Sequence, residues 1–541
     1  MNISVVDICI FAGYCLLILG IGLFVSRNKK GIKKDSSDYF LAGRGLAWWA
    51  IGASIIASNI SAEQFIGMSG SGYAIGLAMS IYEWIAALGL IIVAKWFMPI
   101  FLQKRIYTMP QFLEQRFDAR VKTVMSIFWL AVFIFINLTS IMYLGALTIQ
   151  NVIGVPLMYG VLFLALFAAI YSIYGGLKAV AITDVVQVIF LVGGGLVTTF
   201  IVVNVLGDGG GLIKGFGNLY ETSHDKFHLI LDASNPGYKD LPGLSVIIGG
   251  LWVANLYYWG CNQYIIQRSL AAKSLNEAQK GMQFAALLKL LIPLIVVIPG
   301  IAVYALGVKL GKSDEAYPWL LSHIIPTGIK GLTFSALIAA IVSSLASMMN
   351  SISTIFTMDI YKPYIEKGAT EGKLVTTGRI SSFAALLIAV AIVPMLTTLD
   401  QAFQYIQEFT GFISPGALAI FLTGFFYKKA SSNGALLAAI GTFVFSTAMK
   451  FAFPALPWMD RMLIVFILCV LTVFITSLIE RANGRRGKRA NARTGEGAKE
   501  RTGVYAKAID ITPGLFKTSR TFNIISFIII AILITFYILW W

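Results

Sequence analysis

Polar residues interrupt an apolar stretch near the start of the chain at a density that suits a binding site. The run from Ser58 to Gln64 holds two serines, an asparagine, a glutamate and a glutamine, and a lone acid, Glu83, lies inside the next apolar stretch. A charged side chain near the centre of a bilayer costs ~2.5 to 3.5 kcal/mol on insertion scales, and unpaired backbone groups there cost several more. We therefore expect this run to line a protected cavity.

Further polar residues lie well inside other apolar stretches. Lys289 stands about ten residues into its stretch, which at 1.5 Å per residue places it roughly 15 Å deep. The stretch from Gly249 to Gly260 is again rich in glycine and polar at mid-depth. The other members of this set are Asp184, Asn255, Ser343, Ser344, Ser347, Gln404 and Gln407.

The composition identifies a membrane protein. Hydrophobic residues make up 57% of the 541 residues and charged residues only 13%, whereas soluble domains are about 25% charged. Apolar runs of ~20 residues, long enough to cross the hydrocarbon layer, predict an all-α polytopic protein with about fourteen transmembrane helices. These runs lie near 5–25, 47–71, 75–100, 122–148, 156–178, 180–206, 243–267, 280–306, 329–357, 378–398, 400–427, 432–454, 460–480 and 521–541.

Positive charge is concentrated in every second loop. Lysines and arginines follow the first, third, seventh, ninth, eleventh and thirteenth runs, and the positive-inside rule places these loops in the cytoplasm and both termini outside. The net charge of +16 does not indicate a nucleic-acid partner, because it is divided among short loops with no common face. The basic linker near 481–510 is expected to be disordered and to contact anionic lipid.

The two interrupted runs, the second and the seventh, lie five runs apart. An inverted repeat of five plus five helices, with the first helix of each repeat broken at the midplane, predicts this spacing. We therefore expect a first helix and basic loop over 1–46, repeats over 47–206 and 243–427 around an external loop at 207–242, and three additional helices over 428–541.

No metal, disulfide or catalytic framework is indicated. The four cysteines are scattered within apolar runs. His224 and His228 have the spacing of a pair of metal ligands, but they lie in a polar external loop with no third ligand nearby. We therefore expect both histidines to be solvated side chains without a metal. No nucleophile lies beside a base, which argues against an enzyme, and no repeated carbonyl filter indicates a channel.

Five segments carry a family resemblance: Asn59 to Phe65, Tyr174 to Ala179, Asn255 to Trp259, Ser343-Ser344 and Gln404 to Gln407. Together they resemble the sodium:solute symporter family, and within it the bacterial sodium/galactose cotransporters, relatives of the animal sodium/glucose transporters. The resemblance covers nearly the whole chain. It implies a leucine-transporter-like fold in the bacterial inner membrane and sodium-coupled import of a neutral hexose by alternating access. The alternative is another polyol, such as myo-inositol.

The resemblance also implies a sugar pocket with gates. It places Gln64, Glu83, Asn255, Lys289 and Gln407 around the sugar, whose hydroxyls need amides, an acceptor carboxylate and a donor ammonium. It implies that Asn59 holds Tyr258, whose ring stacks on the sugar and closes the cytoplasmic side. Met68, Tyr82 and Phe403 would form the outer lid. The alternative is that Glu83 and Lys289 only pair with each other in the packing.

Arginine is expected to be absent from the pocket. Every arginine lies in a loop or at the end of an apolar run, so we expect no guanidinium at mid-depth for a substrate carboxylate. This disfavours amino acids and sialic acid as substrates.

For sodium, the resemblance implies the carbonyls of Ala57, Ile60 and Ala340 and the hydroxyls of Ser343 and Ser344 as ligands. Serines in membrane helices more often pack or bond the carbonyl four residues back, which is the alternative. Asp184 is expected on the ion's cytoplasmic exit path. Either Asp184 forms a second sodium site with Ser347, or it caps the start of a helix.

Overall fold

The computed structural model describes residues 4–27, 35–61, 63–239, 241, 243–398, 402–494 and 508–541. The regular structure of these residues is helical, apart from a parallel bridge between Leu46 and Ala272. The α-helices are α1 (Val5–Ser26), α2 (Ser36–Leu41), α3 (Trp48–Asn59), α4 (Ser69–Ala74), α5 (Ile81–Ile92), α6 (Met98–Lys104), α7 (Met109–Arg116), α8 (Ala119–Ala131), α9 (Thr139–Ile153), α10 (Leu157–Gly175), α11 (Leu177–Leu206), α12 (Gly211–Thr222), α13 (Gly243–Ile248), α14 (Gly250–Gly260), α15 (Gln263–Leu270), α16 (Leu275–Ala305), α17 (Ala316–His323), α18 (Ile329–Ile355), α19 (Glu371–Ile392), α20 (Ala402–Phe426), α21 (Ser432–Ala452), α22 (Trp458–Thr494) and α23 (Arg520–Leu539).

Several of these helices continue into one another through π-helical turns. The π-helical segments are Glu63–Met68, Val93–Phe97, Val132–Leu138 and Phe356–Ile365. Among the described residues, eleven helices are long and apolar enough to cross a membrane, or up to twelve if one bent pair is counted. Helix occurs in every predicted run, including α3 with α4 near 47–71 and α10 near 156–178. The chain is therefore a multi-pass membrane protein, and the count of fourteen crossings stays a prediction.

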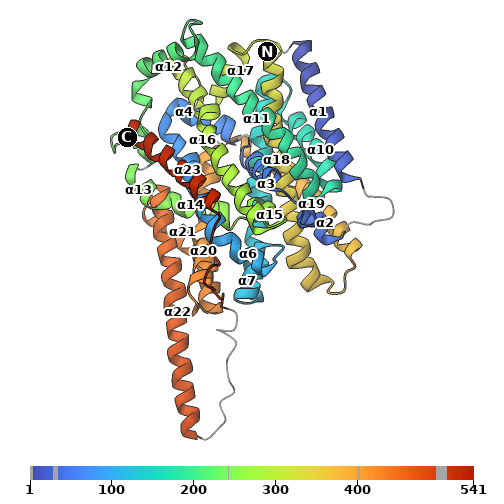
Figure 1. Cartoon of the computed structure of the whole chain (residues 1–541), viewed down its shortest axis with the longest axis vertical. Helices are drawn as coiled ribbons and strands as arrows, with labels where there is room; N and C mark the ends of the chain where they lie inside the picture. Colours follow the sequence, from blue (N-terminus) through green and yellow to red (C-terminus); the bar gives the residue numbers. More distant parts are fainter. Residues whose placement is uncertain are drawn as a thin grey trace.

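The helices differ in how much of their apolar surface is covered by other helices, and this distinguishes central helices from peripheral ones. In the most apolar window of Ile329–Ile365, 94% of the residues are buried, against 17% for Val5–Ser26. Figure 1 accordingly places α18 within the bundle and α1 at its edge, while α22 extends beyond the other helices. Large apolar side chains such as Leu16 and Phe24 are more than 70% exposed on α1, which suits a lipid-facing surface.

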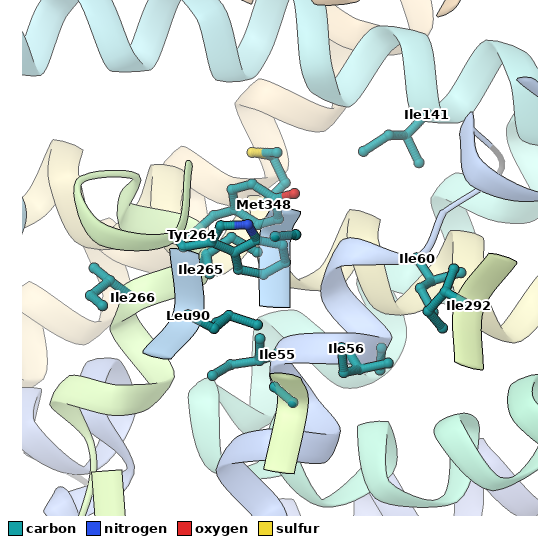
Figure 2. Packing of buried hydrophobic residues seen from close by; sticks show 14 of the residues in the cluster. Ile55, Ile56, Ile60, Leu90, Ile141, Tyr264, Ile265, Ile266, Ile292 and Met348 are labelled. Carbon is teal, nitrogen blue, oxygen red and sulfur yellow. The ribbon is translucent and has the colours of Figure 1, made fainter. Parts of the chain in front are cut away.

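The core joins helices that are far apart in the sequence. Figure 2 shows Ile55 and Ile56 of α3 near Leu90 of α5, with Ile265 of α15 and Met348 of α18 close by. All five are fully buried. Because the interior is close-packed, this cluster fixes the relative positions of the helices that carry the polar runs.

Small residues allow two of these helices to approach closely. A Cβ added to Gly300 of α16 would lie 1.9 Å from the carbonyl oxygen of Ser69, and one added to Gly72 would lie 2.7 Å from that of Val297. Only glycine fits at such contacts, which are typical of packed membrane helices. Gly72 of α4 and Gly300 of α16 thus allow these two helices to pack closely.

Both interrupted runs are broken in the structure. α3 ends at Asn59, Ile60 is extended with φ −78° and ψ 108°, and helix resumes as the π-helical segment Glu63–Met68. α14 ends at Gly260, and the side chain of Asn262 accepts a hydrogen bond from the amide of Tyr264 to begin α15. The second run is therefore broken after Asn59. In the seventh run the glycine-rich segment itself forms α14, and the breaks lie on either side of it, with a bend of 79° between α13 and α14. The five-plus-five symmetry stays a prediction.

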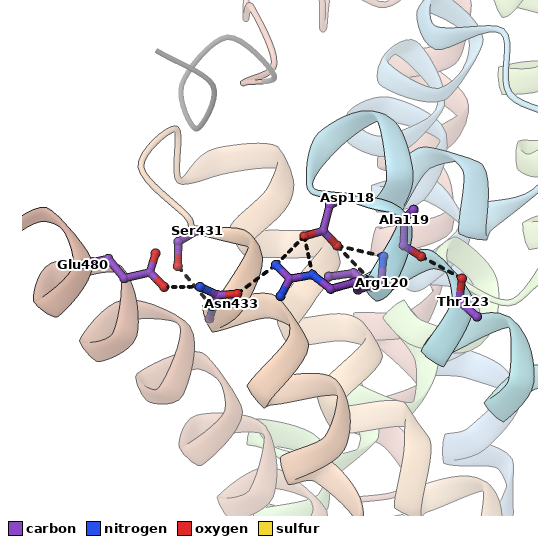
Figure 3. A network of polar contacts seen from close by, with 9 residues as sticks. Asp118, Ala119, Arg120, Thr123, Ser431, Asn433 and Glu480 are labelled. Atoms are coloured by element: carbon purple, nitrogen blue, oxygen red, sulfur yellow. Dashed lines mark hydrogen bonds and ion pairs between the residues drawn. The ribbon is translucent and has the colours of Figure 1, made fainter. Parts of the chain in front are cut away.

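A polar network ties together helix ends on the side of the predicted cytoplasmic loops (Figure 3). Asp118 caps α8 through the amides of Arg120 and Val121 and pairs with the Arg120 guanidinium at 2.7 Å. Arg120 donates to Asn433 at 2.9 Å, and Asn433 donates to Glu480 at 2.7 Å. Because the Arg120 side chain is 60% exposed, this ion pair contributes only about 0 to 1 kcal/mol. The hydrogen bonds through Asn433 join α8, α21 and α22.

Candidate functional site

A cavity of about 100 Å³ lies between the broken helices. This volume holds several water-sized groups. Its lining comes from α3, α5, α9, α14, α15, α16, α20 and α22 and from the π-helical segments Glu63–Met68 and Val132–Leu138. The 22 lining residues are Ser58, Asn59, Ser61, Gln64, Met68, Tyr82, Glu83, Ala86, Asn137, Ile141, Ala254, Asn255, Tyr257, Tyr258, Trp259, Tyr264, Lys289, Thr410, Gly411, Ser414, Trp458 and Met462. Four of the five predicted sugar-binding residues and the gate residues Asn59, Met68, Tyr82 and Tyr258 are therefore brought together.

Lys289 is the centre of the charged part of this lining. Its ammonium donates hydrogen bonds to Glu83 Oε2 and to Asn59 Oδ1, and lies 5.0 Å from the centre of the Trp259 ring. The side chains of Lys289 and Glu83 are only 1% and 5% exposed. The pairing that the sequence left as an alternative therefore exists, and it lies at the cavity wall rather than within the packing.

Asn59 uses both ends of its amide. While its oxygen accepts from Lys289, its nitrogen donates to the hydroxyl of Tyr258 at 2.9 Å. The same hydroxyl is hydrogen-bonded to that of Tyr264, whose ring lies edge-on to Tyr258 at 5.8 Å. The last residue of α3 thus fixes an ammonium and an aromatic ring on opposite sides of one side chain.

The two other predicted amides are held by local contacts. The Asn255 oxygen accepts from the Trp259 indole at 3.0 Å, and its nitrogen donates to the carbonyl of Leu251 at 3.0 Å. Gln64 Oε1 accepts from both the amide and the hydroxyl of Ser61, at 2.9 and 3.0 Å. These contacts fix the orientation of the amides at the wall.

Of the predicted sodium ligands, Ala57 and Ile60 lie at the end of α3, and Ala340, Ser343 and Ser344 lie in α18. The Ser61 amide, which in a continuous helix would bond to the Ala57 carbonyl, is directed at Gln64 instead. The Ser344 hydroxyl donates to the carbonyl of Ser58 at 2.8 Å, which brings α18 against this break. Ala57, Ile60 and Ala340 are all fully buried. All five predicted ligands are thus buried, and one of them, Ser344, contacts the backbone at the end of α3.

Asp184 contacts this region directly. Its carboxylate accepts from the Ser343 hydroxyl at 2.6 Å and from the Ser54 hydroxyl. The side chain is fully buried in α11, seven residues after the helix begins. Its recorded partners are side chains of α3 and α18, which does not favour the alternative of a helix cap.

Arg268 is buried near the predicted sodium ligands, which the sequence did not predict. Arg268, at the end of a predicted run, is fully buried and donates to Ser347, to Ser54 at 3.1 Å and to the carbonyl of Tyr264. Arg268 thus lies at the end of its apolar run, as the sequence indicates, but it is enclosed by protein. The described cavity lining nevertheless contains no arginine.

The structure does not describe the side chains of two predicted site residues, and several residues that line the cavity were not predicted from the sequence. The side chains of Phe403 and Gln407 fall outside the described part of α20. Asn137, Tyr264, Thr410 and Trp458 line the cavity although the sequence did not single them out. The sequence did contain a signal for Asn137, because it is a lone amide inside the apolar run 122–148. In the structure its buried side-chain oxygen has no hydrogen-bond partner among the described residues.

His224 and His228 are not among the residues that line the cavity. The rings of His224 and His228 lie 5.7 Å apart, and His228 Nδ1 lies 3.4 Å from the backbone oxygen of Trp541. Within the described residues, no three His, Cys, Asp or Glu side chains gather as a metal site.

Comparison with known proteins identifies the relatives of this chain. It is 50% identical, over all of its length and 99% of the relative, to the sodium/glucose cotransporter of Vibrio parahaemolyticus. It is 34% identical to the sodium/myo-inositol cotransporter 2 of Mus musculus, over 80% of this chain and 68% of the relative. The human sodium/glucose cotransporter 4 is also 34% identical, over 83% of this chain and 70% of the relative.

Solved structures share the fold. A Na⁺-coupled sialic acid symporter in a substrate-bound outward-open state matches with a TM-score of 0.77 and 22% identity, over 88% of this chain and 98% of that one. Mhp1, a nucleobase-cation-symport-1 family transporter, matches with a TM-score of 0.53 and 13% identity, over 88% and 99%. The predicted leucine-transporter-like class of fold agrees with these matches.

A model of one family covers most of the chain. The description of that family is sodium:solute symporter, and the match spans residues 39–441. The family predicted from the polar segments is thereby confirmed, as is the prediction of a transporter rather than an enzyme. By this match and by its full-length relative, the chain belongs to the sodium:solute symporter family.

Proposed function

We propose that this protein imports a neutral hexose of the galactose or glucose type together with sodium, by alternating access. The observation that carries the proposal is the cluster in which Lys289 contacts Glu83, Asn59 and the Trp259 ring at the cavity wall. A sugar hydroxyl both donates and accepts, so a carboxylate and an ammonium side by side can bind neighbouring hydroxyls of one ring. The full-length relative from Vibrio, named a sodium/glucose cotransporter, supports this substrate class.

The remaining sugar contacts follow from the same wall. Gln64, Asn255 and Gln407 supply amides, and the Tyr258 ring offers an apolar face to the C–H surface of the sugar. In this proposal Tyr258, held by Asn59, closes the cytoplasmic side, and Met68, Tyr82 and Phe403 close the outer side. Hydroxyl recognition by buried polar groups is selective because an analogue that lacks the hydroxyl leaves them unpaired.

Sodium binds, in this proposal, to the carbonyls of Ala57, Ile60 and Ala340 and to the hydroxyls of Ser343 and Ser344. Broken helices supply such carbonyls in secondary transporters. The hydrogen bond from Ser344 to the Ser58 carbonyl supports the placement, because it holds both serines against the break in α3. Asp184, bonded to Ser343, lies on the ion's exit path.

The proposal includes a topology. Both termini lie outside the inner membrane, the chain crosses it fourteen times, and the repeats span 47–206 and 243–427. Each sodium ion that enters then contributes ~2.3 kcal/mol per 100 mV of membrane potential, in addition to its concentration gradient.

A second candidate substrate is myo-inositol, because relatives named sodium/myo-inositol cotransporter 2 are about one third identical to this chain. Reconstitution of the purified protein into liposomes separates the two. We expect sodium-dependent uptake of radiolabelled galactose or glucose that excess unlabelled myo-inositol and fucose inhibit weakly. Stronger competition by myo-inositol than by either hexose would contradict the hexose assignment.

A further inference from the structure

The short helix α15 reaches both proposed sites from a single turn. Tyr264 and Arg268 are four residues apart and therefore lie on the same face of the helix. Tyr264 lines the cavity and its hydroxyl contacts that of Tyr258, the proposed cytoplasmic gate for sugar. Arg268, one turn further on, lies among the serines beside the proposed sodium ligands.

The contacts of Arg268 extend to both helices that would hold the ion. Its Nε donates at 3.1 Å to Ser54 of α3, and Ser54 in turn donates to Asp184. Its other branch donates to Ser347 of α18, whose hydroxyl lies 2.8 Å from that of Ser58. The remaining nitrogen donates to the carbonyl of Tyr264. The rigid fork of one guanidinium thus joins α3, α18 and its own helix.

The bonds form an unbroken series from ion site to gate. Ser343 bonds Asp184, Asp184 bonds Ser54, and Ser54 bonds Arg268. Arg268 then holds the Tyr264 backbone, and the Tyr264 hydroxyl bonds Tyr258. Separation of α3 from α18, which would release sodium, requires at least one of the Arg268 bonds to break.

We propose that Arg268 is a positioning residue that couples sodium occupancy to closure of the sugar gate. Sodium holds Ser343 and Ser344 against the break in α3, this keeps Ser54 and Ser347 spaced to receive the guanidinium, and α15 is thereby held where Tyr264 supports Tyr258. Loss of sodium loosens the same contacts and frees the gate. The inference rests on the proposed function, and it assigns a role to a residue that contacts neither substrate.

The test measures how strongly sodium strengthens sugar binding. Equilibrium binding of radiolabelled galactose to the purified protein is compared in saturating sodium and with choline in its place. Coupled sites usually change each other's affinity about 5- to 150-fold, and we expect a ratio of about tenfold or more for the wild type. Arg268→Gln should reduce this ratio to less than about threefold, and by reciprocity the effect of sugar on sodium affinity should fall equally.

Two further variants separate coupling from folding. Arg268→Lys keeps the charge but cannot bridge Ser54 and Ser347 at once, and Tyr264→Phe deletes only the hydroxyl that reaches Tyr258. Both variants should lower the ratio of sugar affinities with and without sodium. Adding Tyr264→Phe to Arg268→Gln should lower this ratio little further, because the two residues belong to one series of bonds. Arg116→Gln is the matched control: Arg116 is also buried, but it binds the carbonyls of Gly424 and Tyr427, so its ratio should match the wild type.

The outcomes are distinct. A wild-type ratio in Arg268→Gln overturns the inference, and if that variant fails to fold, wild-type ratios in Arg268→Lys and Tyr264→Phe overturn it. A ratio of one in the wild-type protein contradicts the proposed sodium coupling itself, and the linkage with it.

Discussion

Replacing Lys289 with alanine should destabilise the protein as well as weaken sugar binding. The substitution removes the ammonium that Glu83 and Asn59 share. It leaves the Glu83 carboxylate, whose side chain is 5% exposed, without its cation. Breaking a buried pair by removing one partner costs about 3 to 5 kcal/mol. A lost hydrogen bond between the sugar and a charged group, worth about 1.5 to 3 kcal/mol, weakens affinity about 10- to 150-fold.

A double-variant cycle separates the two effects. We expect Lys289→Ala with Glu83→Ala to recover most of the lost stability, because no unpaired charge remains, while sugar affinity stays low. Thermal unfolding in detergent gives the stability of the wild type, both single variants and the double variant, and galactose titration calorimetry gives the affinity. If Lys289→Ala has wild-type stability and affinity, the buried pair and its role at the sugar are both wrong.

Substitutions at four other residues have defined outcomes. Ser343→Ala removes a proposed sodium ligand, so the sodium concentration for half-maximal uptake should rise, and an unchanged value would exclude Ser343 from the ion site. Tyr258→Phe deletes a hydroxyl whose hydrogen bond to Asn59 is worth ~1 kcal/mol, so this variant should bind sugar nearly normally but transport it more slowly. Normal transport by Tyr258→Ala would place the gate elsewhere. Gln407→Ala should abolish galactose uptake without loss of stability, and normal galactose affinity would remove Gln407 from the site. Burial raises the pKa of Asp314, in the loop between α16 and α17, to about 6. Any stability that its protonated form contributes is therefore present below about pH 4 and lost as the pH rises through about 6. The free energy of unfolding of Asp314→Asn should thus depend less on pH across this window than that of the wild type. The same pH dependence in variant and wild type would contradict the raised pKa.

The membrane class and the broken helices are readable from the sequence because both rest on the cost of polar groups in hydrocarbon. Glu83 and Lys289 lie within apolar runs, and a charged side chain at that depth needs an opposite charge or a polar cavity. In the structure the two side chains pair with each other at the wall of the cavity. The break after Asn59 is likewise signalled by a dense polar run, although its π-helical continuation is not, because no local pattern distinguishes a π-turn from an α-turn.

Arg268 shows what the sequence cannot give. Its position at the end of an apolar run has two physical solutions, an exposed side chain at the membrane surface or a buried one satisfied by hydroxyls. The choice depends on Ser54 and Ser347, which lie 214 and 79 residues away. Asn137 was missed for the related reason that a lone amide in a helix indicates depth but not which neighbour it faces.

The central claim is that sodium drives uphill sugar uptake, and accumulation in proteoliposomes tests it most directly. With sodium equal on both sides and an inside-negative potential of about 100 mV, one sodium ion per sugar supplies ~2.3 kcal/mol, enough for about 50-fold accumulation of galactose. We expect accumulation to collapse when the potential is dissipated or choline replaces sodium. Equal accumulation in choline, or equilibration without accumulation in sodium, would contradict the account.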